Sequence, residues 1–207
     1  LKTTETGTNL TIQNCIVQRM TGTAIPYGAI VHYGAAEGTL TLKNTELIAP
    51  VAGTADEINS ASPSVIGVAA WAQTGENIDE AWKLVVTDCT IRTNGFAVFD
   101  RWNNATYTNT TFTGLEGVEG LDDIEVKTCY MALNNPHAND VTYDHCTFRN
   151  MRSWGMLVAG EELTVTDCTF DGTNQSCAIS VAYGTIDKCT ITGNTFDLSG
   201  SGSGIMF

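Results

Sequence analysis

The chain has 207 residues and carries 10 Lys and Arg against 23 Asp and Glu, which gives a formal net charge of −13. An acidic surplus of this size argues against binding to nucleic acid or to anionic membrane surfaces, because both require basic patches. The length fits one domain over residues 1–207, and no apolar run approaches the roughly 20 residues of a membrane span, so we expect no membrane insertion. The sequence starts and stops abruptly, and we expect a piece of a longer chain with flanking modules.

One octet recurs along the chain, with alternating residues on either side of a polar step that is usually Asn or Asp. A period of two that is interrupted by such a residue is typical of a strand, a tight bend and a second strand. In chain order the copies are LTIQNCIV (10–17), LTLKNTEL (40–47), LVVTDCTI (84–91), ATYTNTTF (105–112), VTYDHCTF (141–148), LTVTDCTF (163–170) and GTIDKCTI (184–191).

A second recurring element follows each octet and supplies a third strand per repeat, which predicts a solenoid of about seven coils. Its copies are AIVHYG (29–34), VIGVAAW (65–71), FAVFDR (96–101), YMALNN (130–135), GMLVAG (155–160), AISVAYG (178–184) and GIMF (204–207). Longer repeats carry inserts. We expect the three inserts between octet and third strand to project from one edge of the rod, and these span 18–27, 48–63 and 113–128, with a fourth insert at 72–83.

The octets LTVTDCTF and GTIDKCTI resemble the right-handed parallel β-helix family, the fold of many pectin-degrading enzymes, phage tailspikes and bacterial surface proteins. The resemblance covers nearly the whole chain and implies an all-β fold. Each strand would pair with its equivalent one coil later, with Leu163 and Val165 inward and Thr164 and Thr166 outward. A β-sandwich is the competing fold, but it needs antiparallel hairpins with two-residue turns. Asn94-Gly95, the only Asn-Gly pair, precedes a strand that the repeat already assigns.

Seven cysteines in a chain of this size raise the question of a disulfide framework. The repeat favours another interpretation, in which five of them share one inward column and pack as free thiols. Metal binding by this column is disfavoured because zinc needs convergent ligands and no Cys-x-x-Cys is present. The five aligned cysteines are Cys15, Cys89, Cys146, Cys168 and Cys189.

Aromatic and planar polar residues recur where the third strand of each repeat ends. Residues at one point of successive coils line up along the rod, and aromatic faces with polar groups suit the faces and hydroxyls of a sugar chain. The alternative is that the aromatic rings pack under loops and the polar groups are merely solvated. The predicted carbohydrate-binding residues are His32, Tyr33, Trp71, Trp102, Asn134 and Asn135.

The third insert contains GLEGVEGLDDIEV (114–126), which holds several acids and no base. Clustered carboxylates can bind calcium, which takes six to eight oxygen ligands, although the spacing matches no EF-hand and charge runs are usually solvated. The candidate Ca²⁺ ligands are Glu119, Asp122, Asp123 and Glu125.

The resemblance to pectate lyases and polygalacturonases raises the possibility of catalysis, but a fold does not carry an activity. Polygalacturonase-like chains show Asn-Thr-Asp, Asp-Asp and Gly-His-Gly motifs, and here only an Asp-Asp pair is present, on an insert. The nearest approach to a lyase site is Asp100 and Arg101, with His137 one coil on. Arginine is a poor base, because it stays protonated.

Two functional hypotheses remain open. The favoured one is an extracellular or cell-surface module of bacterial adhesin type that binds a polysaccharide or surface glycan along its lateral face. The alternative is a polysaccharide lyase or glycoside hydrolase that acts on a uronate polymer. Missing motifs favour the first.

Overall fold

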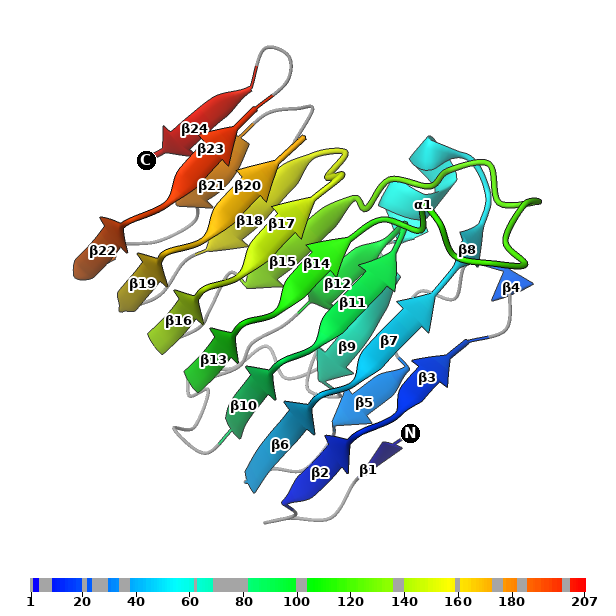
Figure 1. Cartoon of the computed structure of the whole chain (residues 1–207), viewed down its shortest axis with the longest axis horizontal. Coiled ribbons are helices and arrows are strands. Elements are labelled where there is room, and N and C mark those ends of the chain that lie inside the picture. Colours follow the sequence, from blue (N-terminus) through cyan, green and yellow to red (C-terminus); the bar gives the residue numbers. More distant parts are fainter. Residues whose placement is uncertain are drawn as a thin grey trace.

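The chain forms a rod of stacked parallel strands, seen whole in the computed structural model of Figure 1. The structure describes residues 2–3, 9–19, 22–23, 30–33, 38–61, 63–68, 82–99, 104–135, 140–158, 161–172, 177–181, 186–198 and 202–207. Every paired strand in these ranges pairs in parallel with its equivalents in the coils above and below. The predicted parallel β-helix is therefore confirmed, and the β-sandwich is excluded.

Three sheets, which we call A, B and C, form the sides of the rod. Sheet B holds the first strand of each octet: β2 (Leu10–Gln13), β6 (Gly38–Lys43), β10 (Trp82–Thr87), β13 (Asn104–Thr108), β16 (Asp140–Asp144), β19 (Glu162–Thr166) and β22 (Lys188–Thr192). Sheet C holds the second: β3 (Ile16–Gln18), β7 (Glu46–Ala49), β11 (Thr90–Thr93), β14 (Thr111–Thr113), β17 (Thr147–Arg149), β20 (Thr169–Asp171) and β23 (Thr195–Asp197).

Sheet A holds the third strand of each repeat: β1 (Lys2–Thr3), β5 (Val31–Tyr33), β9 (Ser64–Val68), β12 (Phe96–Phe99), β15 (Met131–Asn135), β18 (Trp154–Val158), β21 (Cys177–Val181) and β24 (Ser203–Met206). A small fourth sheet joins β4 (Gly22–Thr23) to β8 (Val51–Ala52), and one short helix, α1 (Ala55–Ala61), follows β8.

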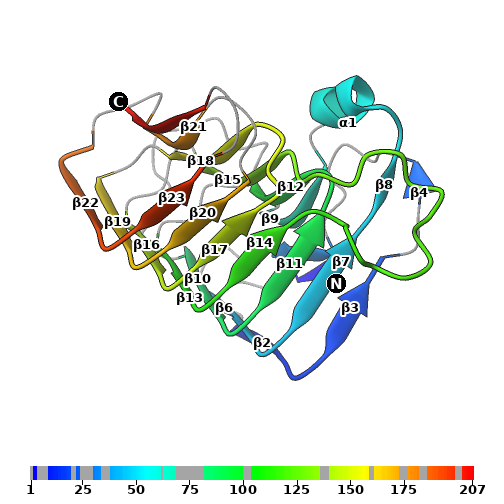
Figure 2. The same cartoon turned by 45° about the horizontal axis from the view of Figure 1, so that its top comes forward.

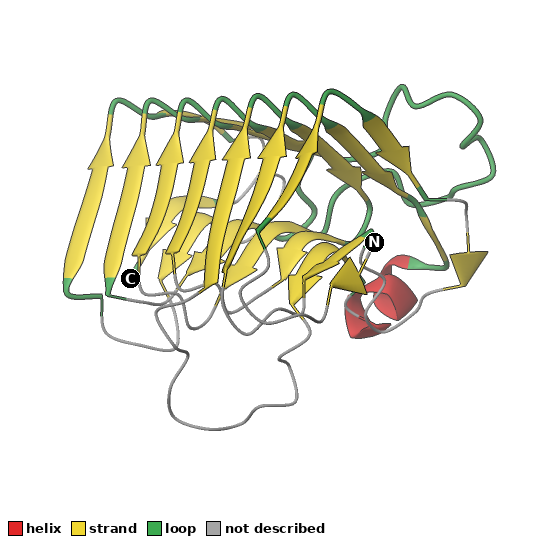
Figure 3. Cartoon of the chain, turned by 90° about the horizontal axis from the view of Figure 1, so that it is seen from below, coloured by secondary structure: helices red, strands yellow, loops and turns green. Residues whose placement is uncertain are grey.

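Each step from sheet B to sheet C turns at one residue with positive φ. This left-handed backbone conformation is accessible to Gly, Asn, Asp and His more readily than to other residues, and it explains the polar step inside every octet. Figure 3 shows the successive bends in a line along one edge of the rod. The bend residues are Asn14, Asn44, Asp88, Asn109, His145, Asp167 and Gly193, with φ between 45° and 69°.

In the core, side chains at equivalent positions of successive coils stack on one another. The rings of Phe112, Phe148, Phe170 and Phe196 lie nearly parallel, with successive centroids 5.1, 4.6 and 5.0 Å apart. Outward positions carry threonines in register, such as the row Thr106, Thr142, Thr164 and Thr190. Inward Leu163 and Val165 are buried while Thr164 and Thr166 are only half-buried, as the alternation predicted.

The last octet is not GTIDKCTI, and this part of the prediction was wrong. Cys189 pairs with Leu163 rather than with Cys168. The position beside Cys168 belongs to Asn194, whose side-chain oxygen accepts the backbone N–H of Cys168 at 2.8 Å. The bend falls at Gly193 because a following TGNTF segment supplies a better left-handed residue than Lys188 does. The cysteine column therefore contains four cysteines, and Cys189 is exposed.

The inserts that can be followed lie together at one edge, as predicted (Figure 2). The described part of the first insert contributes β4, the second contributes β8 and α1, and the third is a loop over 114–128. Asn94 ties two of them to the rod. Its side chain is buried, accepts the N–H of Val51 and donates to the carbonyls of Val51 and Val126, at 2.8–2.9 Å.

Candidate functional site

The predicted carbohydrate-binding residues that the structure describes lie on sheet A. His32 pairs with Gly67, which pairs with Phe99, which pairs with Asn134, so the first and last share one row of the ladder. Tyr33 and Asn135 follow them directly in β5 and β15. Trp71 and Trp102, and the catalytic candidates Asp100, Arg101 and His137, lie outside the described residues, and their roles stay predictions.

A second apolar cluster lies on sheet A, separate from the main core. We call it the outer aromatic cluster: Phe96, Met131 and Leu157, with the half-buried rings of Tyr130 and Trp154 packed against them. The rings of Phe96 and Tyr130 meet edge to face, with centroids 4.9 Å apart. The indole N–H of Trp154 is buried without a hydrogen-bond partner among the described residues.

Tyr130 and Trp154 were not among the predicted binding residues. Tyr130 begins the third-strand copy YMALNN and Trp154 precedes GMLVAG, so an aromatic residue recurring just before these strands was the signal that could have found them. Arg152 flanks the cluster, with its guanidinium 5.3 Å from the Tyr130 ring centre. Burial lowers the pKa of Arg152 from its ordinary value.

Arg152 also fastens the insert edge. Its guanidinium donates to the backbone carbonyl of Thr128 at 2.7 Å and to the side-chain oxygen of Asn59 on α1 at 2.6 Å. A third contact reaches the carbonyl of Asn94 at 3.2 Å. These contacts hold the helix and the third insert against the rod beside the outer aromatic cluster.

The acidic insert is a closed loop with its own small core. Leu115, Leu121 and Ile124 pack on Ile48 beneath it, and the ammonium of Lys127 donates to the carbonyl of Leu121. The four candidate calcium ligands all lie exposed on this loop: Glu119, Asp122, Asp123 and Glu125. No three of their ligand atoms gather within 4.8 Å of one another, and calcium binding here stays a prediction.

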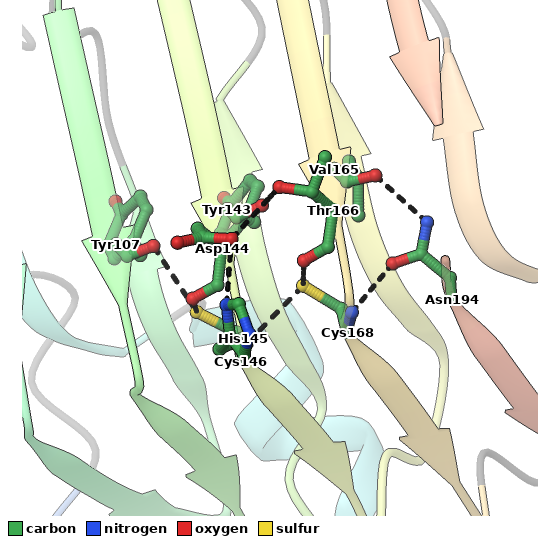
Figure 4. Close-up of polar contacts among 9 residues, drawn as sticks. All are labelled: Tyr107, Tyr143, Asp144, His145, Cys146, Val165, Thr166, Cys168 and Asn194. Carbon is green, nitrogen blue, oxygen red and sulfur yellow. Dashed lines mark hydrogen bonds and ion pairs between the residues drawn. The ribbon is translucent and has the colours of Figure 1, made fainter. Parts of the chain in front are cut away.

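The polar bends bring together a different set of ligands. One oxygen each of Asp144 and Asp167 and one imidazole nitrogen of His145 lie within 4.8 Å of one another, and they form the only such His, Cys, Asp or Glu group in the described ranges. The His145 Nδ1 is 2.9 Å from the Asp144 carboxylate (Figure 4). Asp144 ends β16, and Asp167 is the bend residue one coil later.

Five of the seven cysteines are buried inside the rod. All seven are free, and a hydrogen bond runs from the backbone N–H of Cys146 to the sulfur of Cys168 at 3.3 Å. Burial raises the pKa of the Cys89 and Cys177 thiols, and raises that of Cys129 to about 12. These three groups are therefore neutral thiols near pH 7, and neutral thiols are poor nucleophiles and poor metal ligands.

Comparison with known proteins supports the fold. The family model described as "Right handed beta helix region" matches residues 74–207, which is more than half of the chain. No curated protein and no solved structure gives a significant match. Within the described residues, no helix combines the length and the apolar character that crossing a bilayer requires. The repeated octet, the parallel sheets and this match together place the chain in the right-handed β-helix family.

Proposed function

We propose that this protein is an extracellular or cell-surface β-helix module that binds carbohydrate along sheet A. The single observation that carries the proposal is the outer aromatic cluster, because its partly exposed rings, those of Tyr130 and Trp154, are the kind of group that stacks on sugar faces.

The ladder register supports a linear ligand. His32 and Asn134 share one row of sheet A, and Asn134 stands three positions after Met131 of the outer aromatic cluster in the same strand. A linear ligand along this row would therefore cross successive coils of sheet A. The large negative charge of the chain favours neutral sugars over uronate polymers, unless a cation bridges the two.

A glycan array followed by calorimetry on the best hits tests the proposal. We expect Trp154→Leu, which keeps the apolar bulk but removes the aromatic ring, and Asn134→Ala each to weaken binding about tenfold. Thr164→Ala, on the outward row of sheet B, is the matched control and should bind like the parent. Equal binding by all three variants would refute a site on sheet A.

The same samples separate binding from turnover. Incubation with a panel of uronate and neutral polysaccharides, followed by measurement of unsaturated products and of reducing ends, should show no release. Release would instead establish the lyase or hydrolase alternative. In that case Asp100→Asn, Arg101→Ala and His137→Ala are the first variants to assay, since the resemblance to pectate lyases points to those positions.

A further inference from the structure

The bends form a polar column in which two pairs of neighbouring side chains hydrogen-bond to each other. The side-chain amide of Asn44 donates to the side-chain oxygen of Asn14 at 2.9 Å, and that of Asn109 donates to the Asp88 carboxylate at 2.7 Å. Each of these steps pairs an amide donor with an acceptor. One step in the column is built differently.

At that step an imidazole and two carboxylates meet. From this geometry we propose that Asp144, His145 and Asp167 bind a divalent transition-metal ion with the ligand preferences of Zn²⁺. Their ligand atoms already lie within 4.8 Å of one another, and Asp144 and His145 are in contact at 2.9 Å. Zinc accepts imidazole nitrogen and carboxylate oxygen at about 2.0–2.2 Å, which puts ligand atoms roughly 3.5 Å from one another, so a bound ion requires the Asp144–His145 contact to open slightly and only small shifts of the side chains.

The charges at this step call for a cation. Among the described residues, the Asp144 carboxylate contacts His145 and accepts one further hydrogen bond, from the Thr166 hydroxyl at 3.1 Å. The carboxylate of Asp167 has no hydrogen bond and no ion pair among the described residues. No Lys or Arg of those residues pairs with either acid, whereas Arg149 is paired with Asp171 in the neighbouring sheet. Two carboxylates this close repel each other unless a positive charge lies between them.

The next coil leaves room for Asp167. A Cβ on Gly193 would stand 2.0 Å from the Asp167 carboxylate, so a side chain at that position would displace the acid. Gly193 is the only glycine in the bend column. Gly193 therefore has two roles: it leaves space for the Asp167 carboxylate, and it adopts the left-handed bend without strain.

The ligand set selects the class of metal. Calcium and magnesium prefer oxygen ligands, and a histidine is a poor choice for either. One imidazole with two carboxylates suits Zn²⁺ or a similar first-row ion and leaves a coordination position for water. This site is independent of the carbohydrate proposal, since sheet A contributes none of its ligands.

The bend column supplies variants that keep the fold. Asn occupies the equivalent position in three other coils, so His145→Asn and Asp167→Asn preserve a residue that tolerates positive φ. The matched control is Asp88→Asn, an equal loss of one bend carboxylate at a step without histidine. All proteins carry Cys189→Ser, because the exposed Cys189 thiol is itself a potential zinc ligand.

Titration of the folded chain with Zn²⁺ by calorimetry tests the proposal. We expect one saturable site, weakened at least tenfold by His145→Asn and by Asp167→Asn and unchanged by Asp88→Asn. In NMR spectra, the ring protons of His145 should shift on adding the ion, while those of His32 and His137 should not. The absence of saturable binding would overturn the proposal. So would equal affinity in the parent and the two ligand variants, since the ion would then be bound elsewhere.

Discussion

The stacked sheets and the insert edge are stabilised in different ways. In the stack, each coil repeats the contact of the one before it, as with the phenylalanine rings from Phe112 to Phe196. At the insert edge nothing repeats, and Asn94 and Arg152 hold the inserts through individual buried polar contacts. The stacked coils are therefore stabilised by many equivalent contacts, whereas the position of each insert depends on one or two residues. Substitutions in the stack and at the insert edge should therefore differ in the size and the reach of their effects.

Removing a ring from the middle of the stack should cost the most. Phe148→Ala deletes a fully buried side chain that stacks on both neighbours, and we expect a loss of about 4 kcal/mol in the free energy of unfolding. Phe196→Ala is the comparison, because Phe196 is only half-buried and stacks on one described ring. Urea denaturation of both variants measures the difference. Equal losses would contradict the dependence on two neighbours.

Removing the Asn94 side chain should detach the inserts more than it weakens the rod. Asn94→Ala leaves the N–H and carbonyl of Val51 and the carbonyl of Val126 without partners, which costs about 3 kcal/mol. Hydrogen exchange should rise in 48–63 and 113–128 while sheets B and C stay protected. Ser60→Ala, an exposed change on α1, is the control. Uniform deprotection of the whole chain would argue against a local anchor.

High pH should destabilise the protein through its buried thiols. The pKa of Cys129 is raised to about 12 by burial, from a model-compound value of 9.0. Between these values the unfolded thiol is ionised while the folded one keeps its proton, so stability is full below pH 9 and is lost as pH rises toward 12. The slope from this group is about 1.4 kcal/mol per pH unit. Denaturation at several alkaline pH values should give a shallower slope for Cys129→Ala than for the parent.

A small gain is expected from Tyr143→Phe. Tyr143 is fully buried, its hydroxyl has no hydrogen-bond partner among the described residues, and burial raises its pKa well above the ordinary value. Tyr143→Phe keeps the ring stacked on Tyr107 and removes a buried hydroxyl whose loss of hydration no hydrogen bond offsets. The free energy of unfolding should therefore rise by about 1 kcal/mol. Thermal melts provide the measurement, and a clear loss of stability would indicate a bound water at the hydroxyl.

The fold could be predicted from the sequence because each coil repeats the same local requirements. A left-handed residue between two alternating stretches fixes the bend, and the bend fixes which residues stack. The same logic misplaced the last coil, since GTIDKCTI imitates the octet while TGNTF supplies the residue that actually turns the chain. The residue pattern fits a bend at either Lys188 or Gly193, and the choice between them depends on which residue adopts positive φ more easily.

The candidate sites were harder to predict because they depend on contacts between distant segments. Asn94 was noticed only as part of an Asn-Gly pair, and nothing local indicates that it reaches Val51 and Val126. His145 occupies the polar step of the octet VTYDHCTF and turns the chain there, but its proximity to Asp167 follows only from the coil register. Tyr130 and Trp154 pack against the same apolar cluster on sheet A, and the repeat pattern does not predict that contact.

The aromatic residues also allow the packing of the interior and of the surface to be followed spectroscopically. Tyr107 and Tyr143 lie 4.7 Å apart with their planes only 4° from parallel, inside the middle of the rod. Rings fixed in one chiral arrangement give a near-ultraviolet circular dichroism signal that vanishes when tight packing is lost. In a variant in which Trp71, Trp82 and Trp102 are replaced by Phe, Trp154 would report by fluorescence on the partly exposed edge of the outer aromatic cluster. One heating experiment that follows both signals would reveal whether the surface loosens before the interior melts.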